Sequence, residues 1–222
     1  MKKFFRNNGL SAVLFLLFAA SLGGQYFTGL AEYNGDREEH GATSVGYLEY
    51  LGEGHFVEAV FENWESEFLQ MAMYVLLTVA LFQKGSSESK DPDKEERVDK
   101  IAAAAAAKNP KSPWPVRRGG IALKFYQNSL SIALIALFVV SLVIHAAGGA
   151  VEYSREQIAH GMPSVTTAEY LATSRFWFES FQNWQSEFLS IGVMVVFTIF
   201  LRQKGSPESK AVDASHDKTG AG

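Results

Sequence analysis

The chain has 222 residues, of which 47% are hydrophobic and 20% charged, with a formal net charge of −4 and no cysteine. The lack of cysteine excludes disulfides, thiolate metal sites and thiol catalysis. These averages alone describe an ordinary soluble domain, but the distribution of apolar residues along the chain indicates a membrane protein.

The first apolar stretch covers residues 10–30 and carries no charge. As a helix it can cross about 30 Å of hydrocarbon. An alternative makes residues 1–22 a cleaved signal peptide, because basic residues precede an apolar run that ends in Ala19, Ala20 and Ser21. We favour retention, since this region matches an internal stretch around residues 128–142 that cannot be a signal peptide.

Three more spans are expected, over residues 56–82, 130–151 and 176–201. The span 130–151 has His145 as its only ionisable group. The other two contain shorter apolar runs, which are extended by aromatic residues at helical spacing. Trp64 and Trp184 precede these runs and are predicted to be interface anchors.

A sequence block occurs twice at a constant offset of 120. Aligning residues 32–90 with 152–210 requires no gap and leaves 27 of 59 positions identical. We therefore predict an all-α integral membrane protein with four transmembrane helices, built as two tandem hairpins with the same orientation. The expected divisions are a first repeat over 1–90, a flexible cytoplasmic linker over 91–120, a second repeat over 121–210 and a disordered tail over 211–222.

Basic residues predict the orientation. Seventeen of the twenty lie in the N-terminal tail, in the central segment between residues 83 and 124, or after residue 201, whereas Arg37, Arg155 and Arg175 lie in the other loops. The positive-inside rule then places both termini and the linker in the cytoplasm.

Polar residues recur on one face of the second helix of each repeat, spaced by three and four positions. Such a stripe is typical either of an ion or proton path or of hydrogen bonds between packed helices. Its members are Asn63, Glu67, Gln70, Tyr74, Thr78, Asn183, Glu187, Ser190 and Thr198.

Gln25 and His145 occupy equivalent positions in the first spans and could meet as an intramembrane polar pair.

The outer loops also share residues. The spacing of Thr166 and Glu169 predicts a capping box, so we expect a short amphipathic helix in each loop, with Tyr and Leu facing the membrane. Loop side chains that could ligate a metal are His40, His160, Glu49 and Glu169. Hydrogen bonds between loop and helix explain them better, so no metal is predicted.

The repeated pattern FxNWxSEFL…QKGSxESK resembles an uncharacterised family of bacterial inner-membrane proteins known by a domain-of-unknown-function label. The resemblance covers nearly the whole chain and implies no functional residues.

We expect a non-catalytic scaffold, sensor or assembly component of the bacterial inner membrane, without a cofactor. The alternative is a small ion or proton channel or carrier with its path between the repeats. The expected partner is the lipid bilayer, a homo-oligomer and an unidentified protein partner stay open, and no nucleic-acid partner is expected.

Overall fold

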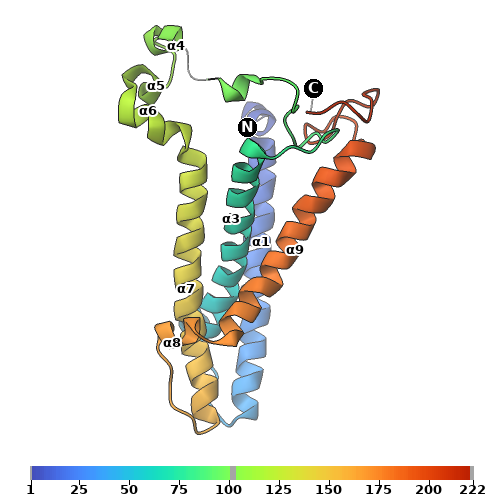
Figure 1. The fold of residues 1–222 in the computed structure, drawn as a ribbon. Coiled ribbons are helices and arrows are strands. Elements are labelled where there is room, and N and C mark those ends of the chain that lie inside the picture. Colours follow the sequence, from blue (N-terminus) through green and yellow to red (C-terminus); the bar gives the residue numbers. More distant parts are fainter. Residues whose placement is uncertain (1, 101–103, 221–222) are drawn as a thin grey trace. The chain divides into compact units, whose positions relative to one another are not determined.

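The computed structural model describes residues 2–100 and 104–220, and within them the chain is all-helical, without strands. The four long helices are α1 (Lys2–Glu39), α3 (Gly54–Ala80), α7 (Ser129–Ala159) and α9 (Ser174–Phe200) (Figure 1). The short elements are α2 (Tyr47–Tyr50), η1 (Arg97–Asp99), α4 (Ala104–Lys108), α5 (Trp114–Arg118), α6 (Gly120–Gln127) and α8 (Thr167–Leu171).

Three helices of the described chain, rather than the four expected, are long and apolar enough to cross a membrane: α1, α7 and α9. The span predicted over residues 56–82 corresponds to α3, which is long enough but not apolar enough to be counted with them. Although α3 has 27 residues, its first half carries Glu58, Glu62, Glu65 and Glu67. The apolar part after Glu67 is too short by itself for about 30 Å of hydrocarbon.

Two asparagines interrupt the helices before the first and third apolar stretches. Asn8 has non-helical angles inside α1 (φ −132°, ψ 16°), and Asn128 separates α6 from α7 with similar angles (φ −113°, ψ 9°). Each side-chain amide donates to a carbonyl four residues earlier, at 3.1 and 2.9 Å. This local bond competes with the backbone hydrogen bonds of the helix. It explains why the helix is interrupted at both asparagines, which lie 120 positions apart.

The chain divides into two compact units. The first unit comprises Met1–Phe61 and Ile144–Phe176, and the second comprises Glu62–Val143 and Trp177–Gly222. Each unit therefore draws segments from both halves of the sequence.

In the first unit, a tyrosine of each short loop helix packs on a glycine of a long helix. Tyr50 of α2 and Tyr170 of α8 are 1% and 0% exposed. A Cβ added to Gly29 or Gly149 would lie 2.5 Å from the nearest atom of the facing tyrosine. The two tyrosines thus face the protein interior, and the expectation that they face the membrane is wrong because the glycines leave room for their rings.

The predicted capping box of α8 is confirmed. Glu169 N donates to Thr166 Oγ1 at 3.2 Å, while Thr166 N donates to the Glu169 carboxylate at 2.7 Å. These bonds hold the pKa of Glu169 below its ordinary value.

In the second unit, the repeated Gln-Lys-Gly-Ser motif ends α3 and α9 with a turn. Gly85 and Gly205 have φ values of 87° and 86°, which favour glycine. The serine four residues after each glycine closes the turn with its hydroxyl group. Ser89 Oγ accepts from Gln83 N at 2.8 Å, and Ser209 Oγ accepts from Gln203 N at 2.9 Å. The motif is thus a structural turn after the helix.

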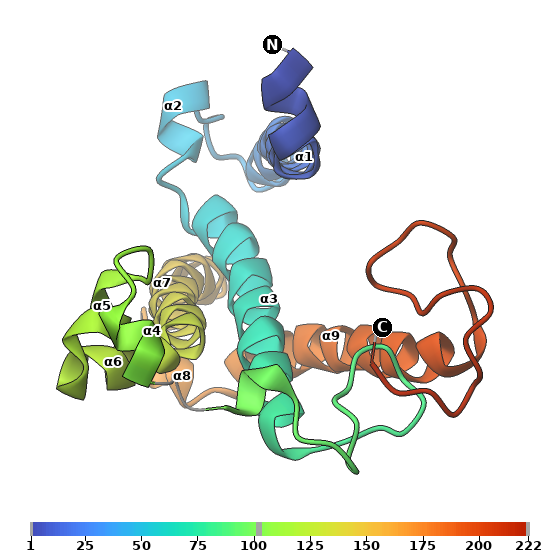
Figure 2. The same ribbon diagram turned by 90° about the horizontal axis from the view of Figure 1, so that it is seen from above.

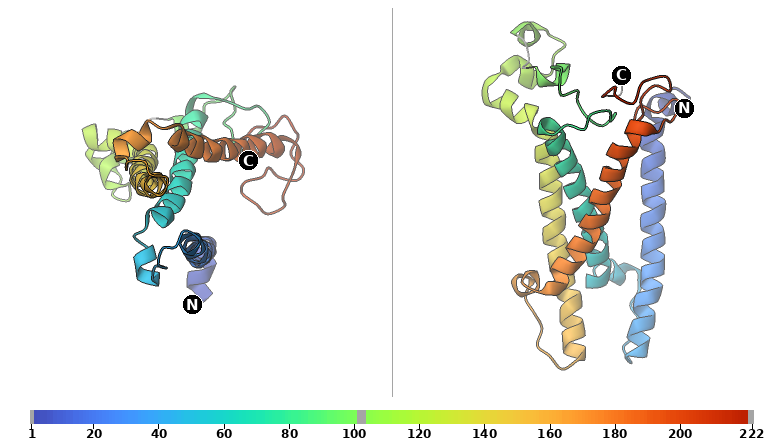
Figure 3. Two further views of the ribbon diagram at one scale, coloured as in Figure 1. Left: turned by 90° about the horizontal axis from the view of Figure 1, so that it is seen from below. Right: turned by 45° about the vertical axis from the view of Figure 1, so that its right-hand side comes forward.

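The segment after α9 folds back beside the end of that helix (Figure 3). Lys210 is only 2% exposed, and its ammonium group donates to the carbonyls of Gly85, Ser215, His216 and Lys218. Gly220 N also donates to Ser86 O at 2.9 Å. Elsewhere in this unit α4 contacts α5, and α5 contacts α6 (Figure 2).

Candidate functional site

The predicted polar stripe does not form one continuous buried face. Gln70 and Thr198 are buried; Tyr74, Thr78, Asn183 and Glu187 are half-buried; Asn63, Glu67 and Ser190 are exposed.

Where the stripe is buried, its side chains make direct hydrogen bonds within the second unit. Gln70 Nε2 donates to Ser190 Oγ at 2.9 Å and to the carbonyl of Glu187 at 2.8 Å. Thr198 Oγ1 lies 2.9 Å from Ser86 Oγ. Thr78 bonds to the carbonyl of Tyr74 in its own helix. This pattern is typical of packed polar helices.

Trp184, predicted as an interface anchor, also has a polar partner in the second unit. Its indole Nε1 donates to Glu65 Oε1 at 3.0 Å, and Glu65 is 0% exposed. Trp64 is half-buried.

A cavity lined by many charged side chains lies in the first unit, has a volume of about 590 Å³ and is called the outer pocket below. This volume is within the usual range for sites that bind small molecules. Besides Tyr33, its ionisable lining groups are four carboxylates, two arginines and three histidines: Glu32, Asp36, Glu152, Glu156, Arg37, Arg155, His40, His55 and His160.

The charges of the outer pocket are arranged around Arg155. Its guanidinium pairs with Glu152, lies 3.4 Å from Asp36 and stands over the Tyr33 ring at 4.6 Å from the centroid. Glu156 pairs with Arg175. The pocket thus contains groups of both signs, held in place by ion pairs and an aromatic ring.

The predicted loop histidines line this pocket, and each directly follows a long helix and bonds back to a carbonyl of that helix. His40 Nδ1 lies 2.9 Å from Asp36 O, and His160 Nδ1 lies 2.8 Å from Glu156 O. Since a carbonyl only accepts, Nδ1 carries a proton in both rings.

The other two loop candidates are helix caps, because Glu49 and Glu169 accept from the backbone N–H groups of Gly46 and Thr166. Within the described residues, these four side chains do not form a group with ligand atoms within 4.8 Å of one another. Their arrangement therefore does not fit a metal in this structure.

His55 connects the outer pocket with the core of the first unit. Its Nδ1 lies 2.8 Å from the Tyr50 hydroxyl, and its Nε2 lies 3.3 Å from Glu32 Oε2. Burial raises the pKa of Tyr50 to about 12, aided by the negative charge of Glu32. Tyr50 thus stays protonated near neutral pH.

The predicted pair Gln25 and His145 lies in two different environments. His145 is fully buried and packs on Phe176 with 4.9 Å between ring centroids. Gln25 lines a smaller cavity together with Tyr50 and His55.

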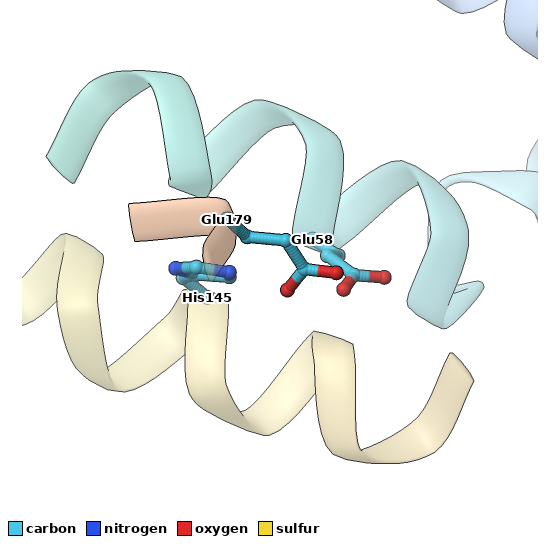
Figure 4. A group of neighbouring side chains, drawn as sticks. All are labelled: Glu58, His145 and Glu179. Carbon is cyan, nitrogen blue, oxygen red and sulfur yellow. The ribbon is translucent and has the colours of Figure 1, made fainter. Parts of the chain in front are cut away.

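Sequence reasoning missed Glu58, which is buried in the first unit. Its carboxylate accepts from the Tyr170 hydroxyl at 3.0 Å. Figure 4 shows Glu58 of α3 beside His145 of α7; the third labelled residue, Glu179, lies on α9 beyond Phe176 and is counted in the second unit.

The spacing of the acidic residues at the start of α3 is the signal that could have revealed this burial. Glu58, Glu62 and Glu65 follow one another at intervals of four and three, which places them on one helical face. The predicted stripe instead begins at Asn63 and Glu67, both of which are exposed.

Comparison with known proteins gives a match over residues 1–221 to the model of a family whose activity is not known. Among curated proteins and among solved structures, no match was found.

Proposed function

We propose that this chain, which belongs to the family described as Domain of unknown function (DUF6766), is a non-catalytic membrane sensor or assembly component that recognises its ligand in the outer pocket. The observation that carries the proposal is the convergence of four carboxylates, two arginines and three histidines on one cavity of about 590 Å³. A small ligand with both an ammonium and an acidic group would find partners for each.

The wider setting is part of the same proposal. The protein is a multi-pass protein of the bacterial inner membrane. In addition to α1, α7 and α9, α3 crosses it as a fourth helix, because its 27 residues together extend over about 40 Å even though its apolar part alone is too short. The excess of basic residues in the termini and in the central segment supports a cytoplasmic location for them. The outer pocket then opens on the opposite side, at the ends of α1 and α7.

The test is ligand-induced stabilisation of the purified protein in detergent, with a panel of zwitterionic amino acids and of simple cations and anions. A ligand at a hundred times its Kd stabilises the folded state by about 2.7 kcal/mol. Asp36→Asn, which alters the pocket, should abolish the shift in Tm. Glu38→Gln is the matched control because Glu38 lies two residues away, bonds to Ser44 and is not part of the lining. Equal loss in both variants, or no shift with any ligand, would refute the proposal.

The alternative function is an ion or proton channel or carrier, in which a homo-oligomer provides the width that one chain lacks. The observation that favours it is the burial of Glu65 in a helix proposed to lie in the membrane. The direct bonds of Gln70 favour packing instead.

Flux of protons and cations into liposomes separates these functions. Wild type and the Glu67→Gln/Glu187→Gln double variant are compared at matched incorporation. Flux that is lost in the double variant supports the channel, whereas no flux above empty liposomes counts against it.

A further inference from the structure

A stretch rich in positive charge precedes α7. Residues 108–128, called the basic segment below, contain five basic residues and no acidic one. All five are exposed, and none of them takes part in an ion pair in the part of the chain that the structure describes. They are Lys108, Lys111, Arg117, Arg118 and Lys124.

Residues 88–100, called the acidic stretch below, belong to the same unit and contain their own counter-charges. Six of these thirteen residues are acidic. Lys90 pairs with Asp99 at 2.5 Å between nitrogen and oxygen, and Lys94 pairs with Asp91 at 2.8 Å. Of the two stretches, the basic segment is therefore the one that offers a net positive charge to an anionic partner.

The basic segment is folded, because two glycines turn the chain between its helices. Gly119 and Gly120 have φ values of 68° and 58°, in the left-handed region that favours glycine. α5 and α6 contact each other across this turn, before the start of α7 (Figure 1). The Arg118 guanidinium lies over the Trp114 ring at 5.2 Å from its centroid. The cations of α5 and α6 therefore belong to one folded surface.

Large apolar side chains are exposed beside these cations. Trp114 lies in α5, while Ile121 and Phe125 lie four positions apart on one face of α6, and all three are exposed. Helices that lie on a bilayer combine such residues, because apolar side chains enter the acyl boundary while Lys and Arg meet the phosphate groups. A purely electrostatic partner, such as an acidic protein, would leave the three apolar side chains in water.

The position of the basic segment in the chain favours the same partner. α6 has eight residues, which extend over about 12 Å, and only Asn128 separates it from α7. α7 is long and apolar enough to cross a membrane. When α7 is inserted, the bilayer surface is thus the anionic surface that lies nearest to the basic segment.

We therefore propose that the basic segment binds the surface of a bilayer that contains anionic phospholipids, with its cations at the phosphate groups. Trp114, Ile121 and Phe125 enter the boundary between headgroups and acyl chains. This binding is independent of the outer pocket and its ligand, and it requires only that α7 crosses the membrane. Each Lys or Arg beside an anionic surface strengthens attachment about fivefold, so removing three of them should weaken it about a hundredfold.

The chain has no cysteine, so one introduced cysteine carries a fluorescent label at a known position. The full chain with Val116→Cys in α5 is placed in phosphatidylcholine vesicles that contain a phospholipid with a nitroxide on its headgroup. The nitroxide quenches a label at the membrane surface, and its presence in both leaflets makes the direction of insertion irrelevant. Anionic phosphatidylglycerol is then added stepwise, and the quenching gives the equilibrium constant of attachment. Val98→Cys, in η1 of the acidic stretch, is the matched control label.

The two labels should respond differently to the anionic lipid. Quenching at position 116 should rise with the phosphatidylglycerol content, whereas quenching at position 98 should stay low. With the label at position 116, Arg117→Gln/Arg118→Gln/Lys124→Gln should lower the equilibrium constant of attachment about a hundredfold.

The matched variant, Lys94→Gln/Arg97→Gln/Lys100→Gln, removes three positive charges from the acidic stretch instead and should keep the wild-type constant. Equal quenching at every phosphatidylglycerol content, or equal losses in the two triple variants, would overturn the proposal. Attachment that polyglutamate abolishes at equal charge would assign the basic segment to an acidic protein and would also overturn it.

A measurement without charge substitutions decides the outcome if circular dichroism shows that a triple variant fails to fold. Attachment of the chain labelled at position 116 should weaken as the NaCl concentration rises from about 50 to 500 mM, because salt screens interactions between exposed charges. Attachment that salt does not change would rest on the apolar side chains alone and would overturn the proposal. Failure of the proposed function would appear separately, as a lack of ligand-induced stabilisation in the wild-type protein.

Discussion

Replacing Gly29 and Gly149 by alanine tests whether the tyrosine–glycine contacts hold the first unit together. At Gly29 the added Cβ would lie 2.5 Å from the Tyr50 hydroxyl oxygen, whereas the next ring atom is at 3.5 Å. At Gly149 it would lie 2.5 to 2.7 Å from the hydroxyl and from two ring carbons of Tyr170. Only the clash at Gly29 is confined to a hydroxyl oxygen, which a tyrosine-to-phenylalanine substitution removes.

The expected magnitude follows from two opposing effects. Overpacking of a buried site costs about 1–3 kcal/mol, and alanine recovers roughly 1 kcal/mol of helix propensity relative to glycine. At Gly149 the displaced ring also weakens the bond from Tyr170 to Glu58, which adds about 1.5–3 kcal/mol. We expect Gly29→Ala to lower Tm by a few degrees and Gly149→Ala to lower it by about three times as much.

Second substitutions distinguish the two sites. Tyr50→Phe should rescue Gly29→Ala, because it removes the one atom that clashes. Tyr170→Phe should not rescue Gly149→Ala, because the ring carbons still clash. Thermal unfolding in detergent, followed by circular dichroism, measures all four chains. Gly35→Ala is the control, since nothing lies within 4 Å of its added Cβ. Equal rescue at both sites, or a loss in Gly35→Ala as large as that in Gly149→Ala, would refute the reasoning.

Three further predictions concern single groups. Trp184→Phe removes the indole N–H that donates to buried Glu65 and should lower the free energy of unfolding by about 1–3 kcal/mol. The control Trp177→Phe, at an exposed position, should lower it less. Equal losses in the two variants would contradict a stabilising role for the bond between Trp184 and Glu65. Lys210→Met leaves four backbone carbonyls without their ammonium donor. The amides of the segment after α9 should therefore exchange hydrogen about tenfold faster. Lys204→Met, at an exposed position, is the control and should leave these exchange rates unchanged. Burial raises the pKa of Tyr50 from 10.0 to about 12. The unfolded chain therefore ionises first, and stability should fall between pH 10 and 12 less steeply in Tyr50→Phe than in wild type.

Local features were predictable from the sequence because neighbouring residues determine them. The capping box of Thr166 and Glu169 is formed by two side chains three positions apart, and it occurs where expected. The long helices also follow the apolar periodicity, although α1 and α7 extend well beyond the expected spans.

Tertiary contacts were less predictable because they depend on distant glycines and on buried charges. The sequence shows Tyr50 as an aromatic loop residue, and only the space above Gly29 turns it inward. Likewise the identity of Glu58 alone does not show that it is buried, because its burial beside Tyr170 involves a residue 112 positions away.

The outer pocket illustrates the same limit. His40 and His160 were singled out as possible ligands, and both do line one cavity. Their backbone bonds could not be foreseen from their identity alone. His55 was not considered, because its equivalent in the second half is an arginine and the match between the halves fails at that position.

The first unit is built from two segments that are far apart in the sequence, which has a consequence for how the chain assembles and for how its fragments behave. Because residues up to 61 and residues 144–176 build one unit together, a lone hairpin could complete it only by meeting a second hairpin. Joining the two in one polypeptide makes that encounter intramolecular and raises the effective concentration to the millimolar range. Fragments cut within the central segment should therefore be unstable when expressed singly and should reassemble when produced in the same cell.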